Sequence, residues 1–270
     1  TARNIKKIVR FFQNLTFFRH NFMKTSFILA IVAALTIGVV YADFDFYLFE
    51  TFWPETLCGM SERGSSCWLN PCTDSFTVHG LWPNNTDGSY PSSCGGSSWD
   101  MNLVQDLYNE LIYKWPDYNS SEGKDGCDSN RNSFLEAKTY HSVDYLWEHE
   151  YTKHGTCAIK YEPDTFSDEH DYMSEALYLL DMLDFQGALN QLGYEQGAEG
   201  MVYDDLMNQL AGYYGVTVSV KCQSSIIFGI NACFDLNLGL MDCPSNVVGE
   251  DKSTCKKHAD ALAWPTIKYE

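Results

Sequence analysis

Residues 75–83 read SFTVHGLWP and have the composition of a buried β-strand. From Ser75 to Leu81, β-branched and apolar residues alternate with polar ones, which favours an extended conformation. The glycine near the end of the stretch predicts a turn at that point. We therefore expect a buried strand that presents His79 at its end, beside Trp82.

A second stretch, residues 147–157, reads WEHEYTKHGTC and contains two histidines five residues apart. In a zinc-protease helix the two histidine ligands are four residues apart, so that both project from one face. An α-helix turns by roughly 100° per residue, so a five-residue step places His154 about 140° away from His149. The spacing therefore argues against a zinc site.

Steps of four residues connect His149 with Lys153 and Glu150 with His154, which would place these side chains on one arc of a helix. Two imidazoles, a carboxylate and an ammonium suit proton transfer around a phosphate group. One group moves a proton while the cations hold the negative oxygens.

The first 42 residues read as segments that precede the mature protein. Residues 1–22 come before Met23, the first methionine suited to a translation start, and are interpreted as non-native upstream translation. Residues 23–42 combine a lysine, an apolar stretch and the sequence VYA, which is typical of a cleaved signal peptide. The apolar stretch is short for a membrane span, with an N-terminal anchor as the alternative. Residues 43–270 are expected to form a single domain with no membrane segment.

The expected mature part is strongly acidic. The formal charge of the whole chain is −18, and residues 1–42 carry six basic and no acidic side chains, so the remainder has 12 minus 36, or −24. Such a surface repels polyanions at neutral pH, which excludes a stable nucleic-acid complex through a basic surface. An enzyme with a local cationic pocket remains possible, and an acidic compartment would reduce the repulsion of a phosphate substrate.

The cysteines predict an oxidising compartment. An even number, ten, all beyond residue 42, predicts five disulfides, which leaves no catalytic thiol, and no CxxC pair suggests a zinc ribbon. Two sequons, at Asn84 and Asn119, agree with a secretory route.

Hydrophobic periodicity beyond the first stretch separates a helical middle from a strand-rich end. We expect helices at Met101–Trp115, Val143–Lys153, Ser174–Leu192 and Tyr203–Tyr213, and strands at Val216–Val220 and Ile226–Leu238. Helices and strands that are segregated along a chain argue for an α+β fold with an antiparallel sheet.

The stretches FTVHGLWP (76–83) and HEYTKHGTC (149–157) resemble the two active-site segments of the ribonuclease T2 family, the acid endoribonucleases of secretory, lysosomal and vacuolar compartments. The resemblance extends to the DGSYP turn and to the C-terminal cysteines, and so covers most of residues 43–270. It implies a disulfide-stabilised α+β catalytic domain with a central antiparallel sheet flanked by helices. It also implies an endoribonuclease that needs no cofactor and no metal.

The resemblance implies a role for each residue of the two segments. His154 would take the proton of the ribose 2′-hydroxyl while His79 protonates the leaving 5′-oxygen. Glu150 and Lys153 would stabilise the transition state, and His149 would bind the phosphate. The product would carry a 2′,3′-cyclic phosphate.

Three further residues resemble the family's site for the base upstream of the cut. Trp82 and Tyr90 would stack on that base, which suits broad base tolerance. Asn84 stands where some members have an aspartate that accepts a hydrogen bond from a purine amino group, so the base preference is open. Because a glycan on Asn84 would crowd this site, we expect none there, and Asn119 is the stronger glycosylation candidate.

The family pattern also suggests a disulfide Cys94–Cys157, which would fix His79 relative to His154 and support both stability and activity. The remaining set, expected from spacing, is Cys222–Cys255, Cys233–Cys243, Cys58–Cys67 and Cys72–Cys127.

Three functions remain to be compared. The first is a monomeric, metal-independent endoribonuclease acting on single-stranded RNA, secreted or held in a lysosome-like or vacuole-like compartment. A zinc hydrolase would need a third ligand and a four-residue histidine step. A non-catalytic secreted binding protein on the same scaffold would have no physical need to keep all of His79, His149, Glu150, Lys153 and His154.

Overall fold

The computed structural model describes residues 43–59, 75–118, 145–255 and 261–266, all within one unit of the chain, Ala42–Glu270. The expected upstream segment and signal peptide (1–42), Asn119, and three cysteines, Cys67, Cys72 and Cys127, lie outside these ranges. None of the described helices is long and apolar enough to cross a membrane.

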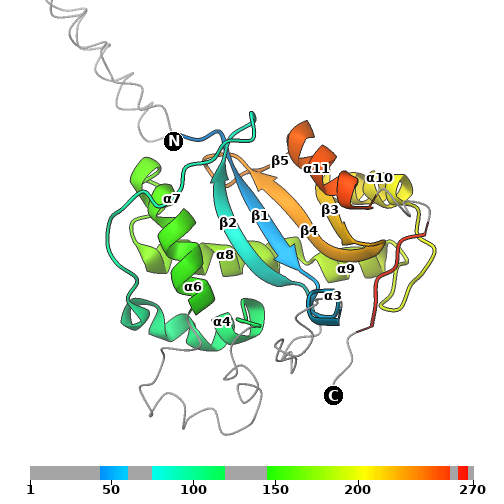
Figure 1. The fold of residues 1–270 in the computed structure, drawn as a ribbon, viewed down its shortest axis with the longest axis horizontal. Coiled ribbons are helices and arrows are strands. Elements are labelled where there is room, and N and C mark those ends of the chain that lie inside the picture. Colours follow the sequence, from blue (N-terminus) through cyan, green and yellow to red (C-terminus); the bar gives the residue numbers. More distant parts are fainter. Residues whose placement is uncertain (1–42, 60–74, 119–144, 256–260, 267–270) are drawn as a thin grey trace, which may run out of the picture. The chain divides into compact units, whose positions relative to one another are not determined.

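An antiparallel sheet forms the centre of the fold (Figure 1). Its strands are β1 (Phe46–Phe52), β2 (Thr77–Asn84), β3 (Ser219–Gln223), β4 (Ile226–Phe234) and β5 (Leu240–Met241). The strand order is β2-β1-β4-β3, with β5 paired to β4. All pairings between these five strands are antiparallel, which confirms the predicted α+β class.

The central strand β1 was not identified by sequence periodicity, because all seven of its residues are buried. Tyr47 and Phe49 belong to the main hydrophobic core. Phe46 and Leu48 belong to a second, smaller cluster on the other face of the strand. A strand covered on both faces reads as a continuous apolar run and lacks the alternation that marks a half-buried strand.

Helices pack around the sheet. They are α3 (Pro54–Gly59), the 3₁₀-helix η2 (Met101–Leu107), α4 (Tyr108–Lys114), α6 (Tyr145–Glu150), the π-helix η5 (Tyr151–Gly155), α7 (Thr156–Tyr161), α8 (Glu169–Leu183), α9 (Phe185–Gln191), α10 (Tyr203–Tyr214) and α11 (Ser245–Cys255). In Figure 1, α8 and α9 pass behind the sheet, α6 and α7 lie beside β2, and α11 lies beside β3. The hydroxyl of Tyr172 in α8 donates to the Leu81 carbonyl of β2 at 2.6 Å.

Three of the predicted helices differ in the structure. The helix predicted at 143–153 is described from Tyr145 and continues through α7 to Tyr161. The predicted helix at 174–192 begins earlier and is divided at Asp184, which adopts a left-handed conformation (φ 39°) and caps α9 through Gly187 N–H. The first half of the predicted helix at 101–115 is 3₁₀. Three residues per turn align Met101 with Val104 toward the core, whereas Leu103, which the α-helical pattern would bury, is 51% exposed.

Strand boundaries also differ from those expected. The turn predicted at Gly80 is absent, because β2 continues through Trp82 and Pro83 to Asn84. The strand predicted at 216–220 is shifted to Ser219–Gln223, and the one predicted at 226–238 ends at Phe234. Tyr203–Tyr214 agrees with the predicted helix to within one residue.

Three disulfides are present among the described residues: Cys94–Cys157, Cys222–Cys255 and Cys233–Cys243. These are the pairs expected from the sequence. The other two predicted pairs, Cys58–Cys67 and Cys72–Cys127, involve residues outside the described ranges and stay predictions.

A buried carboxyl group in α8 makes the stability of the fold dependent on pH. Glu169 is 1% exposed and accepts hydrogen bonds from the Asp100 backbone N–H at 3.1 and 3.3 Å. Burial, together with the charges of Asp100 and Asp168, raises the pKa of Glu169 to about 7. In the unfolded state Glu169 releases its proton above its ordinary pKa of 4.5, whereas in the folded state it keeps the proton up to about pH 7. The contribution of Glu169 to the free energy of unfolding therefore falls as the pH rises from 4.5 to 7.

We predict that Glu169→Gln removes this loss of folding stability with rising pH. At pH 5 the variant and the unmodified protein should unfold at similar denaturant concentrations. At pH 7.5 the variant should be more stable by about 1–3 kcal/mol, since one pKa unit corresponds to about 1.4 kcal/mol. Urea titration at both pH values measures the difference, and the exposed Glu110→Gln is the control. An equal stability difference at the two pH values would contradict the prediction.

Candidate active site

His79 occupies a β-bulge in β2. Glu50 of β1 pairs with Gly80 and Thr51 pairs with Val78, so that His79 has no partner in β1. A bulge adds one residue to a strand and re-aims the side chains next to it. Side chains three apart on a regular strand point to opposite faces, yet the rings of His79 and Trp82 are 4.8 Å apart. The bulge thus allows the rings of His79 and Trp82 to contact each other on one side of the strand.

Gly80 allows the Trp82 indole to cross the strand and reach the neighbouring helix. A Cβ atom at Gly80 would lie 2.1 Å from Trp82 Nε1 and 2.4 Å from Glu150 Oε2. In the space left by the missing side chain, Trp82 Nε1–H donates a hydrogen bond to Glu150 Oε2 at 2.6 Å. The glycine that sequence analysis assigned to a turn therefore serves this close contact.

The helix that carries the second segment contains a π-helical turn. Helices α6 and α7 flank the turn Tyr151–Gly155, in which Thr156 N–H bonds to the Tyr151 carbonyl five residues earlier. The angle of about 140° expected between His149 and His154 assumed a regular α-helix. A π-helical turn contains more residues than an α-helical turn, so the angle between the two side chains is smaller. Such turns occur frequently at functional sites.

The loop after β2 is fixed to this turn. Ser93 N–H donates to the Lys153 carbonyl at 2.9 Å, and Cys94 N–H donates to Thr156 Oγ1 at 3.2 Å. The disulfide Cys94–Cys157 adds a covalent link at the same place. The loop that carries Tyr90 is therefore held against the helix that carries His154.

The rings of the site stack on one another around Trp82. The His154 ring lies 5.0 Å from Trp82 and nearly parallel to it, at 26°. Tyr90 lies 6.3 Å from His154, and Phe52 of β1 stacks on His79 at 4.0 Å and 29°. The two histidines, one from the sheet and one from the helix, thus contact the same indole.

Glu50 of β1 forms a hydrogen bond to His79. This residue was not predicted from the sequence to belong to the site. The Glu50 carboxylate is 2% exposed, accepts a hydrogen bond from His79 Nδ1 at 2.9 Å and forms an ion pair with Lys221 of β3. Burial would raise its pKa, but the hydrogen bonds and charges of His79 and Lys221 outweigh burial and hold the pKa below its ordinary value. An ionised carboxylate only accepts, so His79 Nδ1 carries a proton and Nε2 faces away from Glu50.

Glu150 lies on the other side of His79 in a different electrostatic environment. Its carboxyl group is 2% exposed and lies 4.0 Å from His79 Nε2. Burial raises the pKa of Glu150 to about 7, although the charges of His79 and Lys153 and the Trp82 hydrogen bond act in the opposite direction. Glu150 is therefore protonated in acidic solution, whereas Glu50 is ionised.

His154 is kept neutral. Its side chain is 4% exposed, and within the described residues its Nδ1 atom is buried without a hydrogen-bond partner. Burial lowers the pKa of His154 to about 3, with further lowering from the charges of Lys153, His149 and His79. His149 is exposed, and burial followed by the charge of Lys153 lowers its pKa as well.

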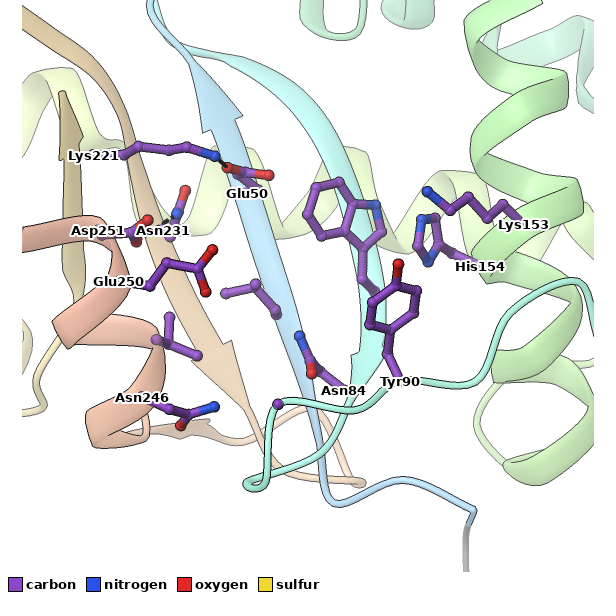
Figure 2. Close-up of a pocket in the computed structure, with 14 residues that line it drawn as sticks. Glu50, Asn84, Tyr90, Lys153, His154, Lys221, Asn231, Asn246, Glu250 and Asp251 are labelled. Carbon is purple, nitrogen blue, oxygen red and sulfur yellow. Dashed lines mark hydrogen bonds and ion pairs between the residues drawn. The ribbon is translucent and has the colours of Figure 1, made fainter. Parts of the chain in front are cut away.

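A pocket of about 320 Å³ opens beside these rings (Figure 2). One wall is formed by the predicted residues Trp82, Asn84, Tyr90, Lys153 and His154. The opposite wall contains residues that sequence analysis did not single out: Lys221, Asn231, Asn246, Val247, Glu250 and Asp251. No sequence motif marks this second wall, because it is assembled from β3, β4 and α11.

The predicted site residues therefore fall into two groups. His79 and Glu150 do not line the pocket but are joined to it through Trp82. His149 lies outside the pocket, and its charge contributes to the lowered pKa of His154. Asn84 lines the pocket, and its side-chain oxygen accepts a hydrogen bond from Asn85 N–H at 2.9 Å. Within the described residues, no three His, Cys, Asp or Glu side chains are grouped as ligands of a metal ion.

The chain is similar to known proteins over most of its length. The model of the Ribonuclease T2 family matches residues 44–243. Ribonuclease DdI of Dictyostelium discoideum is 33% identical over 204 residues, which cover 75% of this chain and 79% of that protein. Extracellular ribonuclease LE of Solanum lycopersicum is 30% identical over 229 residues, which cover 80% of this chain and 88% of that protein.

Solved structures agree with these matches. An RNase-related protein from Calystegia sepium superposes with a TM-score of 0.63 at 28% identity, covering 82% of this chain and 97% of that chain. Human RNase T2 superposes with a TM-score of 0.61 at 25% identity, covering 83% of this chain and 100% of that chain. The matched range includes β1 to β5 and both histidine-bearing segments. The chain belongs to the ribonuclease T2 family and is an endoribonuclease.

Proposed function

We propose that the protein cleaves single-stranded RNA by transesterification, with His154 as the general base and His79 as the general acid. The ribose 2′-oxygen forms a bond to the adjacent phosphorus and the bond from phosphorus to the 5′-oxygen breaks. His154 takes the 2′-hydroxyl proton, and His79 gives a proton to the departing 5′-oxygen. The products are a 2′,3′-cyclic phosphate and a free 5′-hydroxyl. The observation that carries the proposal is that two imidazoles in opposite electrostatic environments contact the same indole.

The environment of His154 suits a base. Because its pKa is lowered to about 3, the imidazole is neutral over the whole range in which RNA cleavage would be measured and can accept a proton. An anionic phosphate bound beside the ring would favour the protonated form and so strengthen the base when substrate is present.

The environment of His79 suits an acid. The Glu50 carboxylate accepts its Nδ1–H and thereby fixes the ring, so that Nε2 is the nitrogen that meets the substrate. The ionised Glu50 carboxylate also places a buried negative charge beside this ring. Glu50 does not contact the reacting atoms in this arrangement and acts as a positioning residue for His79.

Lys153 and Glu150 would stabilise the phosphorus centre during the reaction. Lys153 lines the pocket beside His154 and, within the described residues, forms no ion pair, so its ammonium is available to a phosphate oxygen. Protonated Glu150 adds no negative charge beside that phosphate and can donate a hydrogen bond to it. His149 would bind the phosphate from the exposed edge of the site.

Trp82 and Tyr90 would hold the base upstream of the cut by stacking. Structures of the relative RNase MC1 contain 5′-UMP and 5′-GMP, which agrees with nucleotide binding by this fold. We further propose that the protein acts as a monomer in the secretory pathway, either secreted or in an acidic lysosome-like or vacuole-like compartment. Its disulfides and the name of its extracellular relative support this location.

Cleavage of a short mixed-sequence RNA by residues 43–270 with disulfides formed tests the assignment of the two histidines. We expect 2′,3′-cyclic phosphate ends, detected by mass, at an unchanged rate in excess EDTA. His154→Ala and His79→Ala should each lower kcat by roughly 10²–10⁴-fold, because each removes one proton transfer. His170→Ala is the control, because His170 is half-buried and pairs with Asp106 outside the pocket. Loss of activity in EDTA, or 3′-phosphate ends formed without a cyclic intermediate, would contradict the mechanism.

The pKa of Glu150 predicts a decline of activity toward alkaline pH. Above pH 7 Glu150 ionises, and its negative charge, close to His79, Lys153 and Glu50, then repels the phosphate. Glu150→Gln cannot ionise, so its rate at pH 5 should fall but its ratio of rates at pH 5 and pH 8 should move toward one. Glu148→Gln, an exposed carboxylate on the same helix, should keep the original pH profile. An unchanged alkaline limb in Glu150→Gln would exclude this cause.

The positioning role of Glu50 predicts a loss in kcat and a change in pH profile. In Glu50→Gln, kcat should fall about 10-fold or more with little change in KM, because the ring of His79 loses its fixed orientation. The pH profile should also change, because the variant no longer places an ionised carboxylate beside the general acid. Glu110→Gln removes an exposed carboxylate remote from the site and is the control. A variant with lower thermal stability but unchanged kcat and pH profile would show a purely structural role.

A further inference from the structure

The wall of the pocket opposite the aromatic rings comes largely from α11, a helix that lies beyond the residues matched by the family model. The match ends at residue 243, and α11 runs from Ser245 to Cys255. Asn246, Val247, Glu250 and Asp251 of this helix line the pocket. Figure 2 shows Asn246, Glu250 and Asp251 on the side opposite Tyr90, Lys153 and His154. Four of the six residues of this wall therefore lie beyond the range matched by the family model.

Glu250 is the carboxylate of this pocket that remains available to a ligand within the described residues. Glu50 is occupied by His79 and Lys221, and Asp251 accepts a hydrogen bond from Asn231 Nδ2 at 2.9 Å. The Glu250 side chain is exposed and forms no hydrogen bond or ion pair with another described residue, although its charge acts on Lys221.

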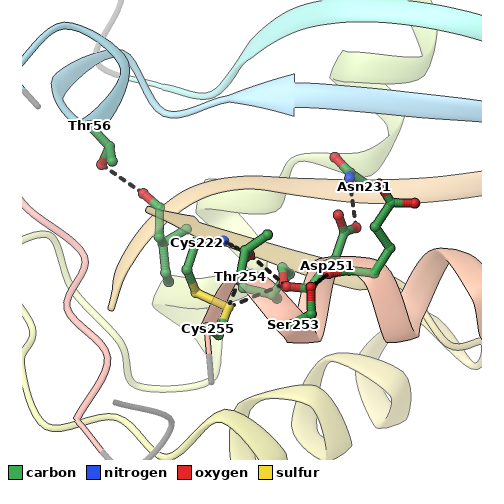
Figure 3. The surroundings of a disulfide bond; sticks show 10 residues. Thr56, Cys222, Asn231, Asp251, Ser253, Thr254 and Cys255 are labelled. Atoms are coloured by element: carbon green, nitrogen blue, oxygen red, sulfur yellow. Dashed lines mark hydrogen bonds between the residues drawn. A yellow bond between two sulfur atoms is a disulfide. The ribbon is translucent and has the colours of Figure 1, made fainter. Parts of the chain in front are cut away.

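The position of this wall is fixed by covalent and polar links to the sheet (Figure 3). The disulfide Cys222–Cys255 joins β3 to the end of α11, and Thr254 Oγ1 accepts a hydrogen bond from Cys222 N–H at 2.8 Å. The contact between Asn231 and Asp251 adds a link one turn earlier in the helix. A side chain presented by α11 is therefore held at a constant distance from the aromatic wall.

The two walls also present amide groups to the pocket. The side-chain oxygen of Asn84 accepts from Asn85 N–H, which leaves the NH₂ group of Asn84 as its donor. Asn246 approaches the loop that leads to Tyr90, since a Cβ atom at Gly88 would lie 3.9 Å from Asn246 Nδ2. A planar ligand between the walls would thus meet a stacking surface, amide donors and one unpaired carboxylate.

We propose that α11 gives this enzyme a preference for guanine at the base stacked on Trp82 and Tyr90, through Glu250. The inference rests on the proposed function, in which this pocket holds the base upstream of the cut. Guanine presents two adjacent donors, N1–H and the 2-amino group, which match the two oxygens of a carboxylate. Its O6 acceptor can receive a hydrogen bond from the amide of Asn84 or Asn246.

The other bases match this wall less well. Adenine and cytosine each present one amino donor next to a ring nitrogen that is an acceptor and would face the carboxylate unfavourably. Uracil presents a single N–H between two carbonyl oxygens, which a carboxylate repels. The carboxylate therefore selects among bases that the aromatic wall accepts equally.

The test compares cleavage of four dinucleoside phosphates, NpU with N as guanosine, adenosine, cytidine or uridine, by the unmodified protein and by Glu250→Gln. We expect kcat/KM for GpU to exceed that for UpU by roughly 10-fold, the effect of one bidentate contact to a base. In Glu250→Gln this ratio should approach one while the rate on UpU stays within about 2-fold. Glu199→Gln removes an exposed carboxylate outside the pocket and should keep the original ratio.

Binding of guanosine and uridine 3′-monophosphates, measured by calorimetry, separates this inference from the proposed function. A guanine preference in binding that disappears in Glu250→Gln supports the inference even if no dinucleotide is cleaved, in which case the proposed function fails alone. Cleavage of all four substrates with equal kcat/KM, or a guanine preference that Glu250→Gln retains, would overturn the inference and leave the proposed function standing.

Discussion

The hydrogen bond from Trp82 to Glu150 across Gly80 connects the two halves of the candidate active site. It joins the sheet, which carries His79, to the helix that carries His154, and it requires a residue without a side chain between them. The bulge at His79 and the π-turn at Tyr151–Gly155 bring the rest of the site to this contact. Each is an irregular element within a regular one, and irregular geometry is tolerated where function requires it.

Buried charges arranged around His79 give its two neighbours opposite roles. Lys221 and His79 keep Glu50 ionised, whereas Glu150, lying slightly farther from His79, is dominated by burial and holds a proton in acidic solution. Two carboxyl groups with equal burial thus differ in charge at the same pH because only one is paired with an ammonium. Similar separation of carboxyl pKa values assigns different roles to paired groups in many hydrolytic sites.

Much of the fold and about half of the site could be predicted from the sequence. The segments around His79 and His154 and three disulfide pairs were identified because their signals are local or belong to a known motif. β1 was missed because burial on both faces removes the alternation that identifies strands, and Glu50 was missed with it. Lys221 and Glu250 join the site only through strand pairing and the position of α11, which no short motif encodes.

The strongly acidic composition and the binding of an anionic substrate are compatible because the site controls its own charge. Lys153 and Lys221 lie at the pocket, Glu150 is neutral below pH 7, and Asp251 is partly protonated in acid because burial raises its pKa to about 6. As the pH falls, these carboxyl groups lose negative charge, so the pocket becomes more positive. The same acidification reduces the repulsion from the rest of the surface, which favours entry of RNA. A rise in pH restores the negative charge of these carboxyl groups, which favours release of anionic products.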